Sequence, residues 1–203
     1  MAKILCLEGC SGTGKTTQTK LIPQFLSSIG KSCNVINEKQ YEPFRSEVIR
    51  WHQIRVVGEL FTWDQIRRFA KARGETHKTH FLETTDCFDF LLFDRSYFTS
   101  AVYQCSKEID SEKIIELNLS EGAIPVDYGF LLECDPKESV RRINNRRIEV
   151  GKYNLPSVHE TLPEIISLRN LYKKMAEKHS ELINITSSKN SLEVLEQIVK
   201  YLK

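Results

Sequence analysis

The sequence lacks several features that mark other classes of protein. No apolar run approaches the ~18 residues that a membrane-spanning helix needs, and Met1 is followed directly by a strand pattern instead of a targeting signal. The six cysteines are scattered, with no C-x-x-C pair and no metal-ligand spacing. We therefore expect a cytoplasmic protein with reduced cysteines and no membrane association.

An excess of one charge sign is also missing, because 29 Lys and Arg face 27 Asp and Glu. A balanced chain gives no electrostatic reason to expect a nucleic acid as main partner. The arginine-rich stretch 141–147 carries no interleaved aromatic residues of the kind that stack on bases. These absences favour a small molecule as the main ligand.

What the sequence does contain is a phosphate-binding loop at residues 9–16, with the pattern G-x-x-x-x-G-K-[ST]. The apolar residues 4–7 precede it as a short buried strand, and a helical pattern follows it. A helix N-terminus after a glycine-rich turn directs backbone N–H groups and the positive end of the helix dipole at an anion. We expect this loop to bind ATP through Gly9, Cys10, Ser11, Gly12, Thr13, Gly14, Lys15, Thr16 and Thr17. The chance alternative is a glycine-rich turn without a ligand.

Strand and helix patterns alternate along the chain. Strand patterns recur at 33–36, 88–93, 128–134 and 182–185, and helices are expected at 45–57, 62–85, 109–119, 137–148 and 160–178. Thr62 and Gln65 form a capping box, Ser191 is placed to cap a last helix, and Pro23 predicts a kink or break in the first helix. The alternation predicts an α/β fold, a three-layer α/β/α sandwich on a parallel sheet of about five strands. At 203 residues we expect a single domain, 1–203.

A second group of site residues follows the strand at 88–93. Asp94 at its end is placed to hold Mg²⁺ or its waters, and the planar fork of Arg95 suits a phosphate. The plain alternative is an aspartate that only caps a helix. Thr16 is the second candidate Mg²⁺ ligand, through its hydroxyl.

Arginines gather just before a loop that contains Gly151 and Pro156. Such a charge run is usually a solvated helix face. Beside a phosphate loop it also predicts a mobile lid over about 141–157, which supplies cations to the migrating phosphoryl group and excludes water. The cluster consists of Arg141, Arg142, Arg146 and Arg147, and we expect the last three to act in catalysis.

These motifs resemble the thymidylate kinase family of nucleoside monophosphate kinases over nearly the whole chain. The stretch from Glu8 to Gln18 is similar to that family's opening motif, and the stretch 94–104 is similar to its D-R-Y…S…A-Y-Q segment. The resemblance implies phosphorylation of dTMP by ATP with Mg²⁺, and a homodimer. It also implies that Phe69 stacks on the base, Arg73 contacts the pyrimidine edge and Tyr103 lies against the deoxyribose.

Three positions depart from the family pattern. Ser11 stands where the family usually has Asp, and Ser96 replaces the third residue of D-R-Y. Tyr41 stands just before Glu42–Pro43, where the family commonly has an arginine that binds the acceptor phosphate. These departures leave the fold unaffected and bear on the identity of the acceptor.

A rival resemblance is to deoxynucleoside kinases, because Glu42–Pro43, Trp51 and Asp94–Ser96 match parts of their motifs. A nucleoside hydroxyl benefits from a general base, for which Glu42 is the candidate, whereas a monophosphate is already anionic and needs cations. Arg45, Arg73 and Arg95 are available as such cations. The Phe69–Arg73 pair and the segment 101–104 favour the monophosphate.

A third alternative is a nucleotide-binding switch without turnover. A guanine-reading N-K-x-D segment is not present, since residues 37–39 do not fit it. We expect Lys15, Asp94 and Arg95, with Arg142, Arg146 and Arg147, to carry catalysis, and Glu42, Arg45, Phe69, Arg73, Arg95 and Tyr103 to bind the acceptor.

Overall fold

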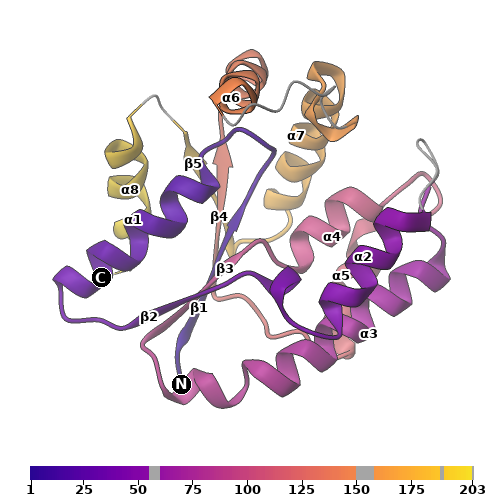
Figure 1. The fold of residues 1–203 in the computed structure, drawn as a ribbon, viewed down its shortest axis with the longest axis horizontal. Helices are drawn as coiled ribbons and strands as arrows, with labels where there is room; N and C mark the ends of the chain where they lie inside the picture. The colour runs from indigo at the N-terminus through magenta and orange to yellow at the C-terminus, as the bar shows by residue number, and fades with distance from the viewer. Residues whose placement is uncertain (55–59, 150–157, 188–189, 203) are drawn as a thin grey trace. The chain divides into compact units, whose positions relative to one another are not determined.

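The computed structural model of the chain describes residues 1–54, 60–149, 158–187 and 190–202 (Figure 1). In this part of the chain, five strands form one sheet in the order β2-β3-β1-β4-β5. The strands are β1 (Lys3–Glu8), β2 (Cys33–Ile36), β3 (Phe90–Asp94), β4 (Tyr128–Glu133) and β5 (Leu182–Thr186). The α-helices are α1 (Lys15–Ser28), α2 (Phe44–Ile54), α3 (Trp63–His80), α4 (Tyr97–Gln104), α5 (Ser111–Ser120), α6 (Pro136–Glu149), α7 (Leu162–Ala176) and α8 (Ser191–Val199).

The strand pairings are parallel. Strand β2 pairs with β3 from Cys33 opposite Phe90 to Ile36 opposite Phe93, and β4 pairs with β5. Strands β1, β3 and β4 are almost wholly buried, as expected for apolar runs covered on both faces. The predicted α/β fold with a five-stranded parallel sheet is confirmed.

The chain forms two compact units, which we describe separately. The first unit comprises residues 1–6 and 23–127, and the second comprises residues 7–22 and 128–203. The first unit therefore holds β2, β3 and helices α2 to α5. The second holds the glycine-rich loop, β4, β5 and helices α6 to α8.

Helix α3 of the first unit begins as predicted and ends earlier. The capping box is present, since Thr62 N donates to Gln65 Oε1 (2.8 Å) and Gln65 N donates to Thr62 Oγ1 (3.3 Å). The helix ends at His80 and does not continue to Thr85, because the hydroxyls of Thr84 and Thr85 donate back to backbone carbonyls and stabilise a 3₁₀ turn, η2 (Glu83–Asp86).

Gly74 lies within α3 because another segment of the first unit approaches there. A Cβ atom on Gly74 would lie 1.8 Å from the carbonyl oxygen of Glu121, just after α5. The low helix propensity of this glycine is therefore offset by close packing between the two helices. Helix α5 follows its predicted range within one or two residues, with Asp110 as N-cap.

The limits of three helices compare differently with their predictions. Helix α1 runs through Pro23 as one element, so of the predicted kink or break the break is absent from its described residues. The N-cap of α8 is Asn190, not Ser191, because the Asn190 side chain accepts from Leu192 N. Helix α2 begins at Phe44 and is described to Ile54, and Val57 lies outside the described residues.

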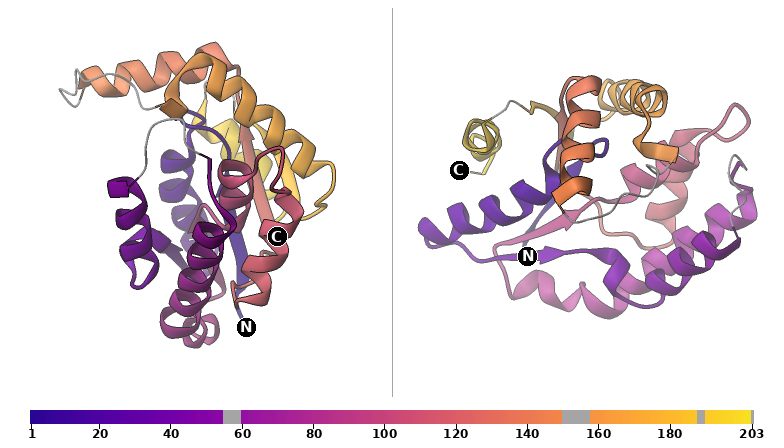
Figure 2. Two further views of the ribbon diagram at one scale, coloured as in Figure 1. Left: turned by 90° about the vertical axis from the view of Figure 1, so that its right-hand side faces the viewer. Right: turned by 45° about the horizontal axis from the view of Figure 1, so that its top comes forward.

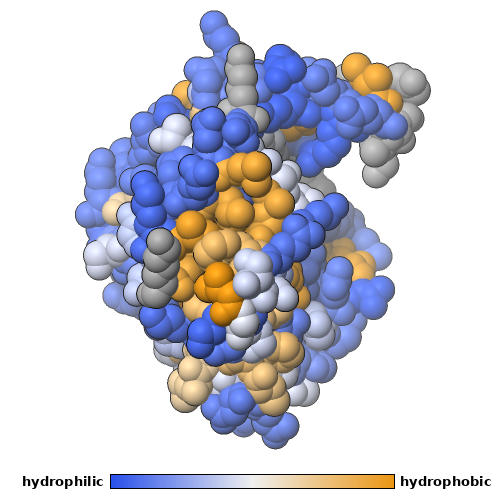
Figure 3. Space-filling model, turned by 90° about the vertical axis from the view of Figure 1, so that its left-hand side faces the viewer, coloured by the Kyte–Doolittle hydropathy of each residue, from blue (hydrophilic) through white to orange (hydrophobic). Residues whose placement is uncertain are grey.

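Helices α6 and α7 of the second unit pack against each other, as two further views show (Figure 2). Between them lie residues 150–157, outside the described part of the chain, and then the 3₁₀ turn η3 (Val158–Glu160). The space-filling view in Figure 3 shows a mainly hydrophilic face on which one group of apolar side chains gathers. No helix among the described residues is long and apolar enough to span a bilayer.

Candidate active site

The glycine-rich loop of the second unit has a backbone shape that requires glycine. Gly9 and Gly12 have φ angles of 124° and 81°, in a region that other residues rarely enter. Space is equally tight, because a Cβ on Gly9 would lie 2.5 Å from Leu132 O and one on Gly12 would lie 2.5 Å from Ser139 O. The loop is therefore fixed against β4 and the first turn of α6.

Lys15 lies folded across this loop. Its side-chain amine donates to the carbonyls of Gly9 (2.8 Å) and Cys10 (2.7 Å), and the residue is 8% exposed. Thr17 N donates to Gly14 O, so α1 starts directly at the end of the loop, and the side chains of Thr16 and Thr17 are exposed. The predicted loop residues are thus brought together at a helix N-terminus, a position that favours anions, and their binding of ATP stays a prediction.

A cavity of about 230 Å³ borders the loop within the second unit. Arg142 on α6 reaches it, since its Nη1 donates to Gly12 O (3.4 Å) and Ser187 Oγ (3.3 Å). Ser187, which sequence reasoning missed, donates in turn to Thr13 O (2.6 Å). The lining residues are Thr13, Gly14, Thr17, Gln18, Arg142, Ser187, Ser191 and Val194.

The other arginines of α6 have different partners. Arg141 is exposed and pairs with Glu138 one turn earlier. Arg146 and Arg147 both lie near the carboxylate of Glu160, at 3.5 and 3.7 Å. Glu160 follows residues 150–157 in the sequence. Most of the predicted loop of the lid, with Gly151 and Pro156, lies outside the described residues, so a catalytic role for Arg146 and Arg147 stays a prediction.

Gly12 offers a direct test of the loop. We expect Gly12→Ala to weaken ATP binding at least about 10-fold, because Ser139 O blocks the new methyl group and the loop must shift away from its phosphate-binding shape. Gly30→Ala is the matched control, since Gly30 also has a positive φ (75°) but has no atom within 4 Å of its added Cβ. Calorimetric titration with ATP compares the two, and equal affinities would show that the loop shape is not needed.

In the first unit, β3 ends at the predicted Asp94–Arg95 pair. Among the described non-glycine residues, Arg95 is the one with a positive φ, 76°, a conformation that costs about 1–3 kcal/mol. Its Nη1 donates to Thr99 Oγ1 (3.1 Å), and its guanidinium lies 5.7 Å from the centre of the Tyr103 ring. Ser96 caps α4 by accepting from Phe98 N. The turn thus directs Arg95 along α4 toward Tyr103, and the predicted contacts of both residues with the acceptor stay predictions.

Phe69 belongs to an aromatic cluster in the same unit. Its ring centre lies 6.0 Å from that of Phe44, 6.4 Å from Trp51 and 5.9 Å from Phe61. Phe69 is 6% exposed. The structure therefore supports a packing role for Phe69, and its predicted contact with a base stays a prediction.

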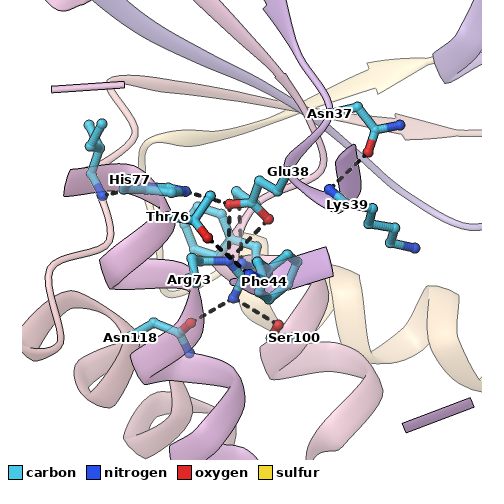
Figure 4. Close-up of polar contacts among 12 residues, drawn as sticks. Asn37, Glu38, Lys39, Phe44, Arg73, Thr76, His77, Ser100 and Asn118 are labelled. Atoms are coloured by element: carbon cyan, nitrogen blue, oxygen red, sulfur yellow. Dashed lines mark hydrogen bonds and ion pairs between the residues drawn. The ribbon is translucent and has the colours of Figure 1, made fainter. Parts of the chain in front are cut away.

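Arg73, also on α3, is buried in a polar network (Figure 4). Its Nε donates to both oxygens of Glu38 (3.0 and 3.1 Å). Its Nη1 donates to Ser100 Oγ (2.9 Å) and Asn118 Oδ1 (2.6 Å). The guanidinium also lies 4.5 Å from the centre of the Phe44 ring. Among the described contacts, Nη2 is the nitrogen of this guanidinium that makes no hydrogen bond to the protein.

His77 completes the network and its tautomer follows from its two bonds. The backbone N–H of Ile124 donates to Nδ1 (2.9 Å), so Nδ1 carries no proton. Nε2 lies 2.6 Å from Glu38 Oε1 and must be the donor in that bond. His77 is thus a neutral hydrogen-bond donor to Glu38.

Glu38 is a buried carboxylate held in its charged form. Burial raises its pKa, but the positive charge of Arg73 and the hydrogen bonds from His77 and Arg73 outweigh this, so the pKa lies below its ordinary value of 4.5. Sequence reasoning missed Glu38. The available signal was its place two residues after the end of a strand, where ligand sites of parallel sheets gather.

Glu42 and Arg45 are both exposed. The Glu42 carboxylate accepts from Ser46 N (3.0 Å) at the start of α2, which makes it a helix cap. Hydrogen bonding by Ser46 lowers the pKa of Glu42 below its ordinary value. The structure supports capping for Glu42, and the acceptor-binding roles of both residues stay predictions.

Comparisons with known proteins agree with one another. The family model described as thymidylate kinase matches residues 7–198. The probable thymidylate kinase 1 of Saccharolobus solfataricus is 29% identical, over 100% of this chain and 98% of its own. The thymidylate kinase of Leptospira interrogans is 27% identical, over 95% of this chain and 90% of its own. The crystal structure of thymidylate kinase from Ehrlichia chaffeensis superposes with a TM-score of 0.66 at 20% identity, over 100% of this chain and 99% of that one, which supports the fold.

Proposed function

This chain belongs to the thymidylate kinase family, and we propose that it transfers the γ-phosphoryl group of ATP to dTMP, forming ADP and dTDP. The observation that carries the proposal is the loop at 9–16, with Lys15 across it and a cavity beside it. Such a loop binds the phosphates of a nucleoside triphosphate through backbone N–H groups.

The cavity next to the loop suits the nucleoside part of ATP. It borders Gly14 and Thr17 at the start of α1 and has both an apolar wall, Val194, and a planar cation, Arg142. A guanidinium plane can stack on an adenine ring, and an apolar side chain can cover the opposite face.

Oxygen ligands at the two predicted metal positions fit Mg²⁺. The Thr16 hydroxyl is exposed at the start of α1, and the Asp94 carboxylate is half-buried at the end of β3. Mg²⁺ prefers such oxygen donors together with phosphates and water, and it would neutralise charge on the transferred phosphate. Thr16 and Asp94 belong to different units, so their joint use stays part of the proposal.

The first unit supplies groups that suit a pyrimidine nucleotide. Arg73 is held rigidly by Glu38 and keeps its Nη2 donor for the pyrimidine edge. Tyr103 and Arg95 lie together and suit the sugar and the phosphate. A donor fixed by a second layer of bonds can discriminate between bases more sharply than a mobile one.

The environment of Glu42 argues against a nucleoside acceptor. A general base should have a pKa near the working pH, whereas the pKa of Glu42 is lowered and its carboxylate already accepts from Ser46. A monophosphate oxygen is anionic and needs no such base. Catalysis then rests on positioning and on cations, namely Lys15, Arg95 and the arginines of α6, with Arg142 already at the loop.

An acceptor panel with ATP and Mg²⁺ tests the proposal. We expect kcat/KM for dTMP to exceed that for thymidine, deoxycytidine and deoxyguanosine by at least about 10³-fold, because the cations of the site have no phosphate to bind in a nucleoside. ADP formation in a coupled assay gives the rates. Phosphorylation of thymidine in preference to dTMP would contradict the proposal, and a large loss of kcat in Glu42→Gln would identify the rival base.

Three further features remain part of this proposal. The homodimer implied by the family resemblance is testable by light scattering of the purified chain. A cytoplasmic location and the closing of a lid over 141–157 stay predictions.

A further inference from the structure

Lys39 lies at the same edge of the sheet as Asp94 and Arg95. The last pair in the parallel register of β2 and β3 is Ile36 opposite Phe93. The residues that follow each strand therefore leave the sheet side by side. These are the short 3₁₀ helix η1 (Glu38–Gln40) after β2 and, in β3, its last residue Asp94 followed by Arg95.

The turn at η1 sends its two charged side chains in different directions. Glu38 points inward and is fixed by Arg73 and His77. Asn37 Oδ1 accepts from Lys39 N (3.2 Å) and thereby fixes the turn. Figure 4 shows the Lys39 side chain pointing away from the Glu38 network. Because Glu38 is anchored and Asn37 holds the Lys39 N–H, the backbone of this turn is fixed, and the exposed Lys39 side chain leaves it away from the network.

Lys39 and Arg95 are cations that act on each other. Partial removal of water from the ammonium lowers the pKa of Lys39, and repulsion by Arg95 lowers it further, while Asp94 and Glu38 act in the opposite direction. Arg73 also contributes repulsion. Because both cations follow strands that end side by side, an anion placed between them would relieve their repulsion.

Tyr41 does not supply the missing cation. It occupies the position before Glu42–Pro43 where the resembled family carries an arginine for the acceptor phosphate. Its ring packs against Phe81, with ring centres 4.9 Å apart, and against His80 at 5.3 Å. The tyrosine is therefore part of the packing against the end of α3, and it offers no positive charge to a phosphate.

We propose that Lys39 binds the phosphate of the nucleoside monophosphate acceptor together with Arg95, taking the part of the arginine absent at position 41. The inference rests on the proposed function, because it assigns a residue to the acceptor half of that site. Lys39 makes the site selective for a phosphorylated acceptor over the free nucleoside.

The test compares Lys39→Gln with Lys78→Gln, which removes an exposed lysine on α3. Loss of one charge-assisted hydrogen bond should weaken dTMP binding about 10- to 100-fold in Lys39→Gln. The affinity for ATP, and the affinity for thymidine where it is measurable, should change less than about 2-fold. Lys39→Arg should recover much of the dTMP affinity because it restores the positive charge. Calorimetric titration with dTMP, thymidine and ATP gives the constants, and steady-state kinetics gives KM for dTMP.

Each outcome has a distinct meaning. If the unaltered protein phosphorylates dTMP and Lys39→Gln binds dTMP as Lys78→Gln does, the inference is wrong and the proposed function stands. If Lys39→Gln weakens dTMP and thymidine equally, Lys39 shapes the pocket and does not bind the phosphate, which also overturns the inference. If the unaltered protein neither binds nor phosphorylates dTMP, the proposed function is wrong, and the inference that rests on it is wrong as well.

Discussion

Replacing Lys15 with methionine is expected to lower kcat/KM for the phosphoryl transfer about 10²- to 10³-fold. The amine is the cation of the loop, and in this structure it is held over the loop by the carbonyls of Gly9 and Cys10. When phosphates bind, such a group can exchange carbonyl partners for phosphate oxygens and stabilise charge that develops in the transition state. Methionine keeps the length and apolar stem of the side chain but removes both the charge and the donors.

The matched control is Lys20→Met, an exposed lysine on the same helix. Steady-state rates of ADP formation with dTMP and ATP compare the two variants, and thermal unfolding shows whether each remains folded. Because Lys15 also bonds to its own loop, a fall in melting temperature of a few degrees is expected and does not explain a large loss of rate. If the folded Lys15→Met enzyme keeps a kcat/KM within about 3-fold of that of the unaltered enzyme, Lys15 and its loop take no part in catalysis.

Replacing Glu38 with glutamine is expected to lower the free energy of unfolding by about 3–5 kcal/mol at neutral pH. Glu38 and Arg73 are 5% and 3% exposed, and their ion pair has a carboxylate oxygen 3.0 Å from Nε. Glutamine fits the same space, but it leaves the Arg73 charge buried without a counter-charge and turns an N–H group toward a donor. For a chain of this length the loss corresponds to a fall in melting temperature of roughly 6–20 °C.

Glu47→Gln makes the same substitution in a more exposed pair. Glu47 lies 3.1 Å from Arg68 Nε, and the Arg68 side chain is 37% exposed, so the expected loss is about 0–1 kcal/mol. Urea unfolding of both variants measures the difference. Similar losses would show that the Glu38 network does not anchor the first unit.

The contribution of Glu38 depends on pH with a definite sign. Because its folded pKa lies below the ordinary 4.5, the folded state holds the charged form more firmly than the unfolded state does. Its stabilisation is therefore complete above about 4.5 and is lost as the pH falls through the lowered folded pKa. The stability difference between the unaltered chain and Glu38→Gln should narrow over this acidic range.

Features that depend on neighbouring residues could be predicted from the sequence. The loop at 9–16 is one contiguous pattern, and glycines at fixed spacing set its backbone whatever surrounds them. The parallel strands appeared as short apolar runs. The start of α3 was predicted from a capping box that spans only four residues, Thr62 to Gln65. Asp94 and Arg95 could be placed at a strand end for the same reason.

Features that join distant segments could not be predicted. The partners of Arg73 come from η1, α4 and α5, so its burial follows from how helices pack and not from its spacing on α3. Among four similar arginines of α6, only the packing of that helix decides that Arg142 reaches the glycine-rich loop while Arg141 remains exposed.

The sequence by itself therefore determined the fold class, the phosphate-binding loop and the strand-end Asp94–Arg95 pair, because each rests on short-range backbone chemistry. Only the tertiary structure decided which charged side chains are buried anchors and which remain exposed. Glu38 and Lys39 are adjacent in the chain, yet Glu38 is buried and bonded to Arg73, and the Lys39 side chain points away from that network. That difference is set by the cost of burying a charge without a partner, and Arg73 supplies a partner for Glu38 alone.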